Sequence, residues 1–385
     1  MVKWLFLLIL GPTLANAQVN DVASTDRTPK SQSAYSVDVI REDASLYLSV
    51  KQKSGFLAAH RGVMSHLPKE SIFGAEVSIA KRLGAQKEWH VRYKHPYIGV
   101  TLYGSTVGNN AILGQAFGSY GFIEFPMNKS KRHQLTGRLG CGVGYITKVF
   151  DQETNPKNVA ISTHVNALIC LAIQGHIQLA ERHQLIYSFD LTHLSNGSSK
   201  VPNLGLNMPN IGLGYAYRLK NEPSSVVLSK GLPQPFFKNW RFHILGVLSA
   251  KEIFPTSGKK FPIYALSIME RKLFRPKVGM EIAFDLMSKQ SVFNYKGYVP
   301  KTQWTIFQMG VYAAYVLPLD HMQIVLGMGA YVKDRYQPDG PLYHRIGMRY
   351  QFDNGVTANL VLKSHWAKAD YIEYGIGYTF KYKKK

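Results

Sequence analysis

Cysteine is scarce in this chain, with only Cys141 and Cys170 among its 385 residues. Alternation of apolar and polar residues around them places Cys141 on an apolar face and Cys170 on a polar face of neighbouring strands. Since side chains on opposite faces cannot be bridged, we expect no disulfide. The sequence also lacks zinc-type Cys/His spacings, HExxH helices and Gly-rich phosphate loops. We therefore expect neither a metal site nor a cofactor.

Long apolar runs are also missing beyond the N-terminus, although 45% of the residues are hydrophobic. A helix that crosses a membrane needs about 20 consecutive apolar residues, so helical membrane spans are excluded there. The apolar residues alternate with polar ones instead, which indicates strands. The 23 tyrosines favour a membrane barrel over a soluble all-β protein, because aromatic residues gather at the two membrane interfaces of such barrels.

Acidic residues are few, since 24 Asp and Glu stand against 46 Lys and Arg, for a formal net charge of +22. Such an excess suits either nucleic-acid phosphates or an anionic lipid surface. No nucleic-acid-binding module is recognisable in the sequence. Because the N-terminus indicates export, we expect a membrane partner and no nucleic acid.

The first 17 residues resemble a signal peptide. Lys3 supplies a positive charge, residues 4–10 supply a short apolar core, and Ala15-Asn-Ala17 is a small-residue cleavage site. We expect cleavage after Ala17, followed by a polar, flexible periplasmic lead-in over residues 18–45. An exported protein without later helical spans is not expected in the inner membrane. We therefore predict that the protein is located in the bacterial outer membrane.

From residue 46 onward, alternation predicts about sixteen strands in two groups, residues 46–220 and 240–385. A Pro/Ser-rich connection over residues 221–239 separates them. The predicted fold is all-β, an antiparallel transmembrane β-barrel, and we favour a single barrel built from both weakly similar halves. The alternative is two tandem eight-stranded barrels. The long connection and the inward Gly212 and Gly214 favour that alternative, because small inward residues suit narrow barrels.

The strongest candidate for chemistry is the end of the predicted strand 177–192. Every second side chain of that strand, on one of its two faces, is apolar, and His193 and Ser195 continue the same face. On a barrel this side faces lipid, near one interface. Residues two apart on a strand lie roughly 6.6 Å apart, a distance that an imidazole can cross to deprotonate a hydroxyl. The simpler alternative is a loop, since Ser-Asn-Gly is a common turn former.

The segment His193-Leu-Ser195-Asn196-Gly197, followed by Pro202-Asn-Leu-Gly205 and an Ile-Gly-Leu-Gly-Tyr strand, resembles the lipid A 3-O-deacylases (PagL-like) of the Gram-negative outer membrane. The resemblance implies that Ser195 is the nucleophile and His193 its base. It also implies that Asn196 and Gly197 help to form the oxyanion hole.

In that family a Glu orients the histidine, and by spacing its place falls on Asn207, on the strand that follows. An asparagine can hold a neutral imidazole by a hydrogen bond but cannot stabilise an imidazolium by charge. We expect Asn207 to lie beside His193 if strand pairing brings the two level. A weak second copy of the motif, Lys363-Ser-His365, has no serine two residues after its histidine, so we expect no catalysis there.

The resemblance implies a serine esterase that removes an ester-linked acyl chain from lipid A, the membrane anchor of lipopolysaccharide in the outer leaflet. Lys200 is the candidate to bind the lipid A phosphates. Two alternatives stay open: a non-catalytic barrel, either a pore or a relic of the enzyme, and an outer-membrane phospholipase.

Overall fold

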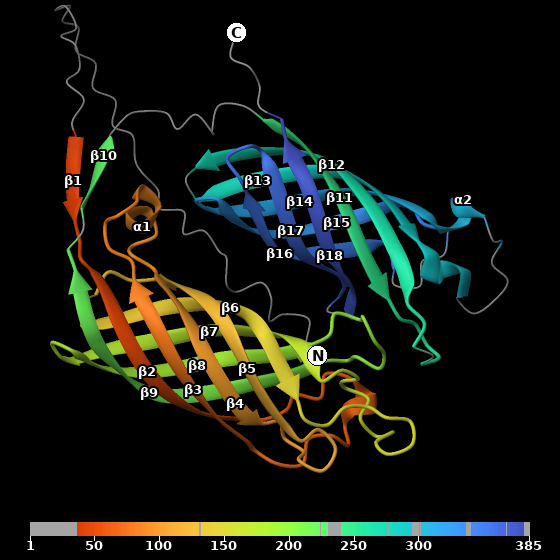
Figure 1. The fold of residues 1–385 in the computed structure, drawn as a ribbon, viewed down its shortest axis with the longest axis horizontal. Coiled ribbons are helices and arrows are strands. Elements are labelled where there is room, and N and C mark those ends of the chain that lie inside the picture. The colour runs from red at the N-terminus through yellow and green to blue at the C-terminus, as the bar shows by residue number, and fades with distance from the viewer. Residues whose placement is uncertain are drawn as a thin grey trace, which may run out of the picture. The chain divides into compact units, whose positions relative to one another are not determined.

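A computed structural model describes residues 37–130, 132–223, 225–229, 240–256, 258–275, 277–294, 300, 302–335, 340–366 and 368–380. These residues form two closed antiparallel barrels of eight strands each and a small two-stranded sheet (Figure 1). The predicted all-β barrel fold is confirmed. The single barrel of about sixteen strands that we favoured is wrong, and the tandem alternative is correct, because the eighth strand of each half pairs with the first strand of the same half.

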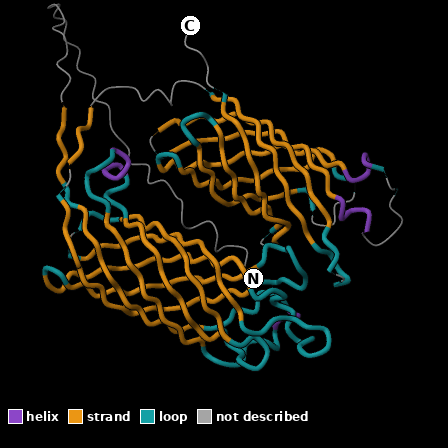
Figure 2. Tube along the Cα trace, viewed as in Figure 1, coloured by secondary structure: helices purple, strands orange, loops and turns teal. Residues whose placement is uncertain are grey.

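The first barrel contains β2 (Ala44–Gly55), β3 (Ile72–Arg82), β4 (Tyr97–Thr106), β5 (Gln115–Pro126), β6 (His133–Ile146), β7 (Val165–Ala180), β8 (His183–Ser195) and β9 (Leu206–Glu222). Its long loops, over residues 56–71, 107–114, 147–164 and 196–205, share one end of the barrel (Figure 2). The loop over residues 56–71 includes the short helix η1 (Gly62–Met64), and the helix α1 (Glu88–Arg92) lies at the opposite end.

The outer wall of this barrel is apolar, because alternate strand residues such as Leu102, Phe189 and Ile211 are 60% or more exposed. The interior carries the charges. Lys53 Nζ lies 2.9 Å from a Glu76 carboxylate oxygen and 2.7 Å from an Asp190 oxygen. The distribution is the reverse of that in a soluble protein, where large contiguous apolar surfaces are rare.

The long-loop end of the first barrel is closed by apolar side chains. They come from the loops as well as the strands, and all are buried: Leu57, Met64, Leu67, Leu113, Ile161, Leu168, Leu194 and Leu206. This apolar cap covers the charged interior below it. The described part of the barrel is therefore a packed core that positions the loop ends.

The second barrel contains β11 (Arg241–Lys251), β12 (Phe261–Arg275), β13 (Val278–Lys289), β14 (Phe307–Leu319), β15 (Met322–Lys333), β16 (Leu342–Gln351), β17 (Val356–His365) and β18 (Lys368–Thr379), with η2 (Gln290–Asn294) and α2 (Gln303–Ile306) between β13 and β14. Its interior is also ion-paired, since Arg345 contacts Asp285 at 2.6 Å and Glu373 at 2.9 Å. His365 is buried and shares a 3.0 Å hydrogen bond with the Tyr331 hydroxyl.

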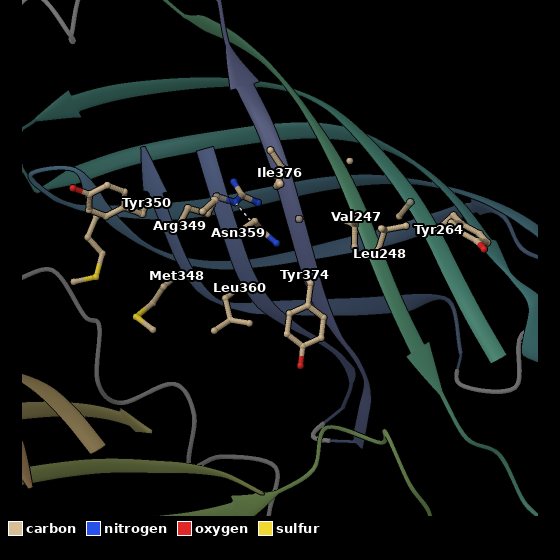
Figure 3. Close-up of a pocket in the computed structure, with 15 residues that line it drawn as sticks. Val247, Leu248, Tyr264, Met348, Arg349, Tyr350, Asn359, Leu360, Tyr374 and Ile376 are labelled. Carbon is tan, nitrogen blue, oxygen red and sulfur yellow. Dashed lines mark hydrogen bonds between the residues drawn. The ribbon is translucent and has the colours of Figure 1, made fainter. Parts of the chain in front are cut away.

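One hollow of about 880 Å³ on the second barrel is lined mainly by apolar residues (Figure 3). Leu248, Leu360 and Tyr374, which are 44% to 62% exposed, belong to its lining. Among its described lining residues there is no serine or histidine of the kind predicted to act in the first barrel.

The expected signal peptide and residues 18–36 of the expected lead-in lie outside the described residues. The rest of that lead-in contains β1 (Val37–Arg41), which pairs with β10 (Ser225–Ser229) from the predicted connection. Cys141 is exposed and Cys170 is buried, so the two side chains lie on opposite faces as predicted, and both are free thiols. Across the residues that the structure describes, no helix is long and apolar enough to cross a membrane.

Candidate functional site

Strands β8 and β9 place His193 directly opposite Asn207 in their antiparallel register. The Nδ1 atom of His193 lies 2.6 Å from Oδ1 of Asn207. An amide oxygen can only accept, so Nδ1 carries the hydrogen and the lone pair of the neutral ring is on Nε2. The expectation that strand pairing brings these two residues level is confirmed.

The side chains of β8 alternate as the sequence predicted. Asp190, Thr192 and Leu194 are buried on the inner parity, whereas Phe189 is 60% exposed on the parity that His193 and Ser195 continue. His193 is half-buried, and Ser195 is only 7% exposed at the point where the strand enters the loop over residues 196–205. The pair therefore occupies the outer side of the barrel at its long-loop end.

The Ser195 hydroxyl oxygen accepts two hydrogen bonds. The Asn203 side-chain amide donates at 2.9 Å and the Gly197 backbone N–H donates at 3.2 Å. Among the hydrogen bonds of the described residues, none joins this hydroxyl to His193, so the contact that the sequence predicted is not formed. The hydroxyl hydrogen is not used by either bond and can be donated to a base. Hydrogen bonds between catalytic groups often close only when substrate is bound.

Asn203 was part of the recognised motif, but no role was predicted for it. Its Oδ1 accepts from the Asn196 backbone N–H at 3.1 Å while its Nδ2 donates to Ser195. A single amide thus connects the start of the loop to the hydroxyl. The signal in the sequence was an asparagine between a proline and a glycine, which is typical of turns that use their own side chains.

Asn196 holds the loop in place. Its Nδ2 donates to Ser162 Oγ at 3.2 Å and to the Lys200 carbonyl at 3.0 Å. Of the two predicted oxyanion donors, the Asn196 backbone N–H donates to Asn203, whereas the Gly197 N–H donates to the Ser195 hydroxyl oxygen. Lys200 itself is exposed at the same loop.

Gly205 makes room for the imidazole. Its φ is +78°, a conformation that glycine adopts at little cost. A Cβ placed on Gly205 would lie 2.8 Å from Cε1 of His193 and 3.6 Å from Nε2. Absence of a side chain at residue 205 therefore allows the ring to occupy its observed position.

His60 is the other residue that sequence analysis missed. It lies on the loop after β2, and its Nδ1 is 3.0 Å from Nδ2 of Asn207. No local pattern could have indicated this contact, because it depends on the closure of the barrel between β2 and β9. Within the described ranges, no group of three or more His, Cys, Asp or Glu residues is arranged to hold a metal ion.

Fold and site together define a protein of tandem antiparallel barrels, the first of which carries a serine, a histidine and an asparagine at one rim. The family model of the lipid A 3-O-deacylase (PagL) matches residues 73–216, and that of the acyloxyacyl hydrolase C-terminal domain matches residues 239–382. The chain belongs to the lipid A 3-O-deacylase family, whose members are ester hydrolases.

Solved structures with some likeness include a triple mutant of the Rhodopseudomonas blastica porin, which is 9% identical with a TM-score of 0.17 over 88% of this chain and 100% of the porin. CdiB from Acinetobacter baumannii is also 9% identical, with a TM-score of 0.18 over 90% of this chain and 66% of CdiB. Scores this low support no argument about fold or function. No curated protein sequence matches the chain significantly.

Proposed function

We propose that this protein is an outer-membrane lipid A deacylase in which Ser195 is the nucleophile and His193 the general base. The observation that carries the proposal is the 2.6 Å hydrogen bond from His193 Nδ1 to Asn207. Because of that bond, the Nε2 lone pair of His193 is available to accept a proton. Ser195, two residues further along the chain, has a hydroxyl hydrogen that neither of its hydrogen bonds uses. The same protonation state is required of a histidine base in serine hydrolases.

The reaction follows from these groups. Ser195 Oγ attacks the carbonyl carbon of an ester-linked acyl chain while His193 Nε2 takes the hydroxyl proton. The tetrahedral intermediate collapses as the imidazolium returns that proton to the departing sugar oxygen, which leaves an acyl-serine ester. Water, deprotonated by His193, then attacks this ester, and the fatty acid leaves as Ser195 recovers its proton.

Two donors are suited to stabilise the oxyanion. The Gly197 N–H and the Asn203 amide already point at the Ser195 oxygen, from 3.2 Å and 2.9 Å respectively. Both lie beside the Ser195 oxygen before substrate arrives, and in the reaction they would pass from that oxygen to the former carbonyl oxygen of the ester. Loss of one such donor typically costs about 2.7–4 kcal/mol in the transition state.

Placement in a membrane is supported by the apolar outer wall of the first barrel. Such a wall matches the lipid-facing surface of outer-membrane barrels, and in a membrane a site at its rim would meet the ester groups that join acyl chains to sugars. The exposed Lys200, beside the site, is suited to bind a lipid A phosphate through its charged amine.

The rival functions are distinguishable on the same structure. A pore through the first barrel is disfavoured by the buried ion pairs of Lys53 with Glu76 and Asp190, and by the apolar cap above them. A phospholipase would use the same serine and histidine on a glycerol ester, so only the substrate separates it from a lipid A enzyme.

The test uses purified protein in detergent, supplied in parallel with lipid A and with phospholipid vesicles. We expect free fatty acid from lipid A alone, and none from the Ser195→Ala variant. Release of fatty acid from phospholipid alone would show that phospholipid is the substrate in place of lipid A. Conductance in planar bilayers without any released fatty acid would favour the pore.

A further inference from the structure

We propose that His60 is a positioning residue, which fixes the orientation of the Asn207 amide and thereby the tautomer of His193. The inference rests on the proposed function of His193 as a base, and it extends the site to a loop that sequence analysis did not include. The three side chains form a continuous chain of hydrogen bonds, from His60 through Asn207 to His193.

The loop after β2 is tied to the beginning of β9. The Ala58 backbone N–H donates to the Asn207 carbonyl at 2.9 Å, and the Phe56 N–H donates to the Pro209 carbonyl at 3.3 Å. These bonds continue the pairing of β2 with β9 past the end of the strand. His60, two residues further on, is therefore carried to the side of the Asn207 amide that faces away from His193.

The two ends of this amide have opposite roles. Its Nδ2 can only donate, so His60 Nδ1 must accept across 3.0 Å, whereas its Oδ1 can only accept from His193 Nδ1–H at 2.6 Å. His60 Nδ1 is also 3.5 Å from the Ala58 carbonyl, a separation too long to compete with the shorter contact.

An amide rotated by half a turn would present N–H groups to His193. The Nδ1 atom would then have to accept, the ring hydrogen would move to Nε2, and the base would be lost. Asn207 alone does not select between the two orientations, because each satisfies one bond to His193. A His60 ring with its hydrogen on Nε2 offers Nδ1 as an acceptor, and it therefore favours the amide orientation that keeps Nε2 of His193 free.

A carboxylate at residue 207 would not need this help, since both of its oxygens accept. The contribution of His60 should therefore depend on the residue at 207. This dependence distinguishes a positioning role from a structural role of the loop, which would be the same in either background.

The experiment compares His60→Ala in the native chain and in an Asn207→Asp background, using purified protein and lipid A. We expect His60→Ala to lower kcat about tenfold with KM unchanged, the loss of one net hydrogen bond. In the Asn207→Asp background we expect a change below about twofold. His60→Asn, which keeps an acceptor near the Nδ1 position, should restore most of the native kcat.

The matched control is His66→Leu. His66 lies on the same loop and bonds through Nε2 to the Lys157 carbonyl at 2.8 Å, away from Asn207. We expect its kcat to remain within about twofold of the native value, because no bond of the site is lost. Equal losses from His60→Ala in both backgrounds, or no loss in the native chain, would overturn the positioning role.

A second measurement does not depend on turnover. In protein with nitrogen-15-labelled histidine, the His193 signals should show hydrogen on Nδ1 and none on Nε2, with a mixture of the two tautomers after His60→Ala. An unchanged His193 tautomer in His60→Ala rejects the inference. If the native protein releases no fatty acid while the tautomer does respond, the proposed deacylase function fails and the positioning role stands.

Discussion

The Asn203 side-chain amide donates a 2.9 Å hydrogen bond to the hydroxyl oxygen of Ser195, from the far side of the loop that joins β8 to β9. The same amide accepts from the backbone N–H of Asn196 at 3.1 Å. One side chain therefore both shapes the loop and directs a donor at the nucleophile. In the proposed reaction this donor stabilises the negative charge that develops beside Ser195.

Asn203→Asp separates these two roles. The new carboxylate keeps the acceptor for Asn196 and has nearly the same shape, but it has no hydrogen to donate. We expect kcat on lipid A to fall about 100- to 1000-fold, the usual effect of losing one oxyanion donor. Asn128→Asp, at a turn on the opposite end of the barrel, is the control and should leave kcat unchanged. A small loss in Asn203→Asp would remove this residue from the oxyanion site.

Gly205→Ala tests the space left for the imidazole. The added Cβ would lie 2.8 Å from His193 Cε1 on a backbone with φ of +78°, so the ring must shift or the loop must strain. Shifts of about 1 Å at a reacting group can cost 100-fold in rate. We expect a loss of roughly that size in kcat on lipid A. Gly62→Ala, whose Cβ would meet nothing within 4 Å, should be active, and equal activity of the two variants would contradict the account.

Lys53→Met tests whether the interior of the first barrel is a packed core. Loss of Lys53 leaves Glu76 and Asp190 without one of their buried partners. Such a change typically destabilises a protein by about 3–5 kcal/mol. Urea unfolding followed by tryptophan fluorescence should show it. Lys81→Ala, which breaks an exposed pair with Glu222, should cost about 0–1 kcal/mol. Equal unfolding midpoints for the two variants would indicate a hydrated, open interior.

Leu213→Arg tests the proposed lipid contact of the outer wall. Leu213 is 62% exposed near the middle of β9, where an arginine in contact with lipid costs about 2–4 kcal/mol. Leu179, 60% exposed at the end of β7, is a matched position at the rim, where the cost falls to about 0–1 kcal/mol. In lipid vesicles, the free energy of unfolding should therefore be lower for Leu213→Arg than for Leu179→Arg. Equal free energies of unfolding for the two variants would indicate that the wall faces water.

Much of the barrel wall could be predicted from alternation alone. The expected strand over residues 177–192 corresponds to β8 (His183–Ser195), although residues 177–180 belong to the end of β7 (Val165–Ala180). Alternation failed where apolar residues belong to a loop. In the loop before β7, Ile161 is buried in the apolar cap and Asn158 donates to the Lys148 carbonyl.

Closure of the sheet was not predictable from the pattern. Alternation defines which side of a strand is apolar, but it does not define which strands pair across a long connection. Pairing of β9 with β2 decided between one barrel and two, and it also placed His60 beside Asn207. By contrast, the contact of His193 with Asn207 followed from two adjacent strands joined by one loop, which is why the sequence could predict it.

The most direct test of the central claim is the mass spectrum of lipid A from a host without such an activity that expresses this protein. We predict the loss of one ester-linked acyl chain with the native protein, and unmodified lipid A with Ser195→Ala or His193→Ala present in the outer membrane at the same level. Unmodified lipid A with the native protein, or an equal loss with Ser195→Ala, would contradict the account.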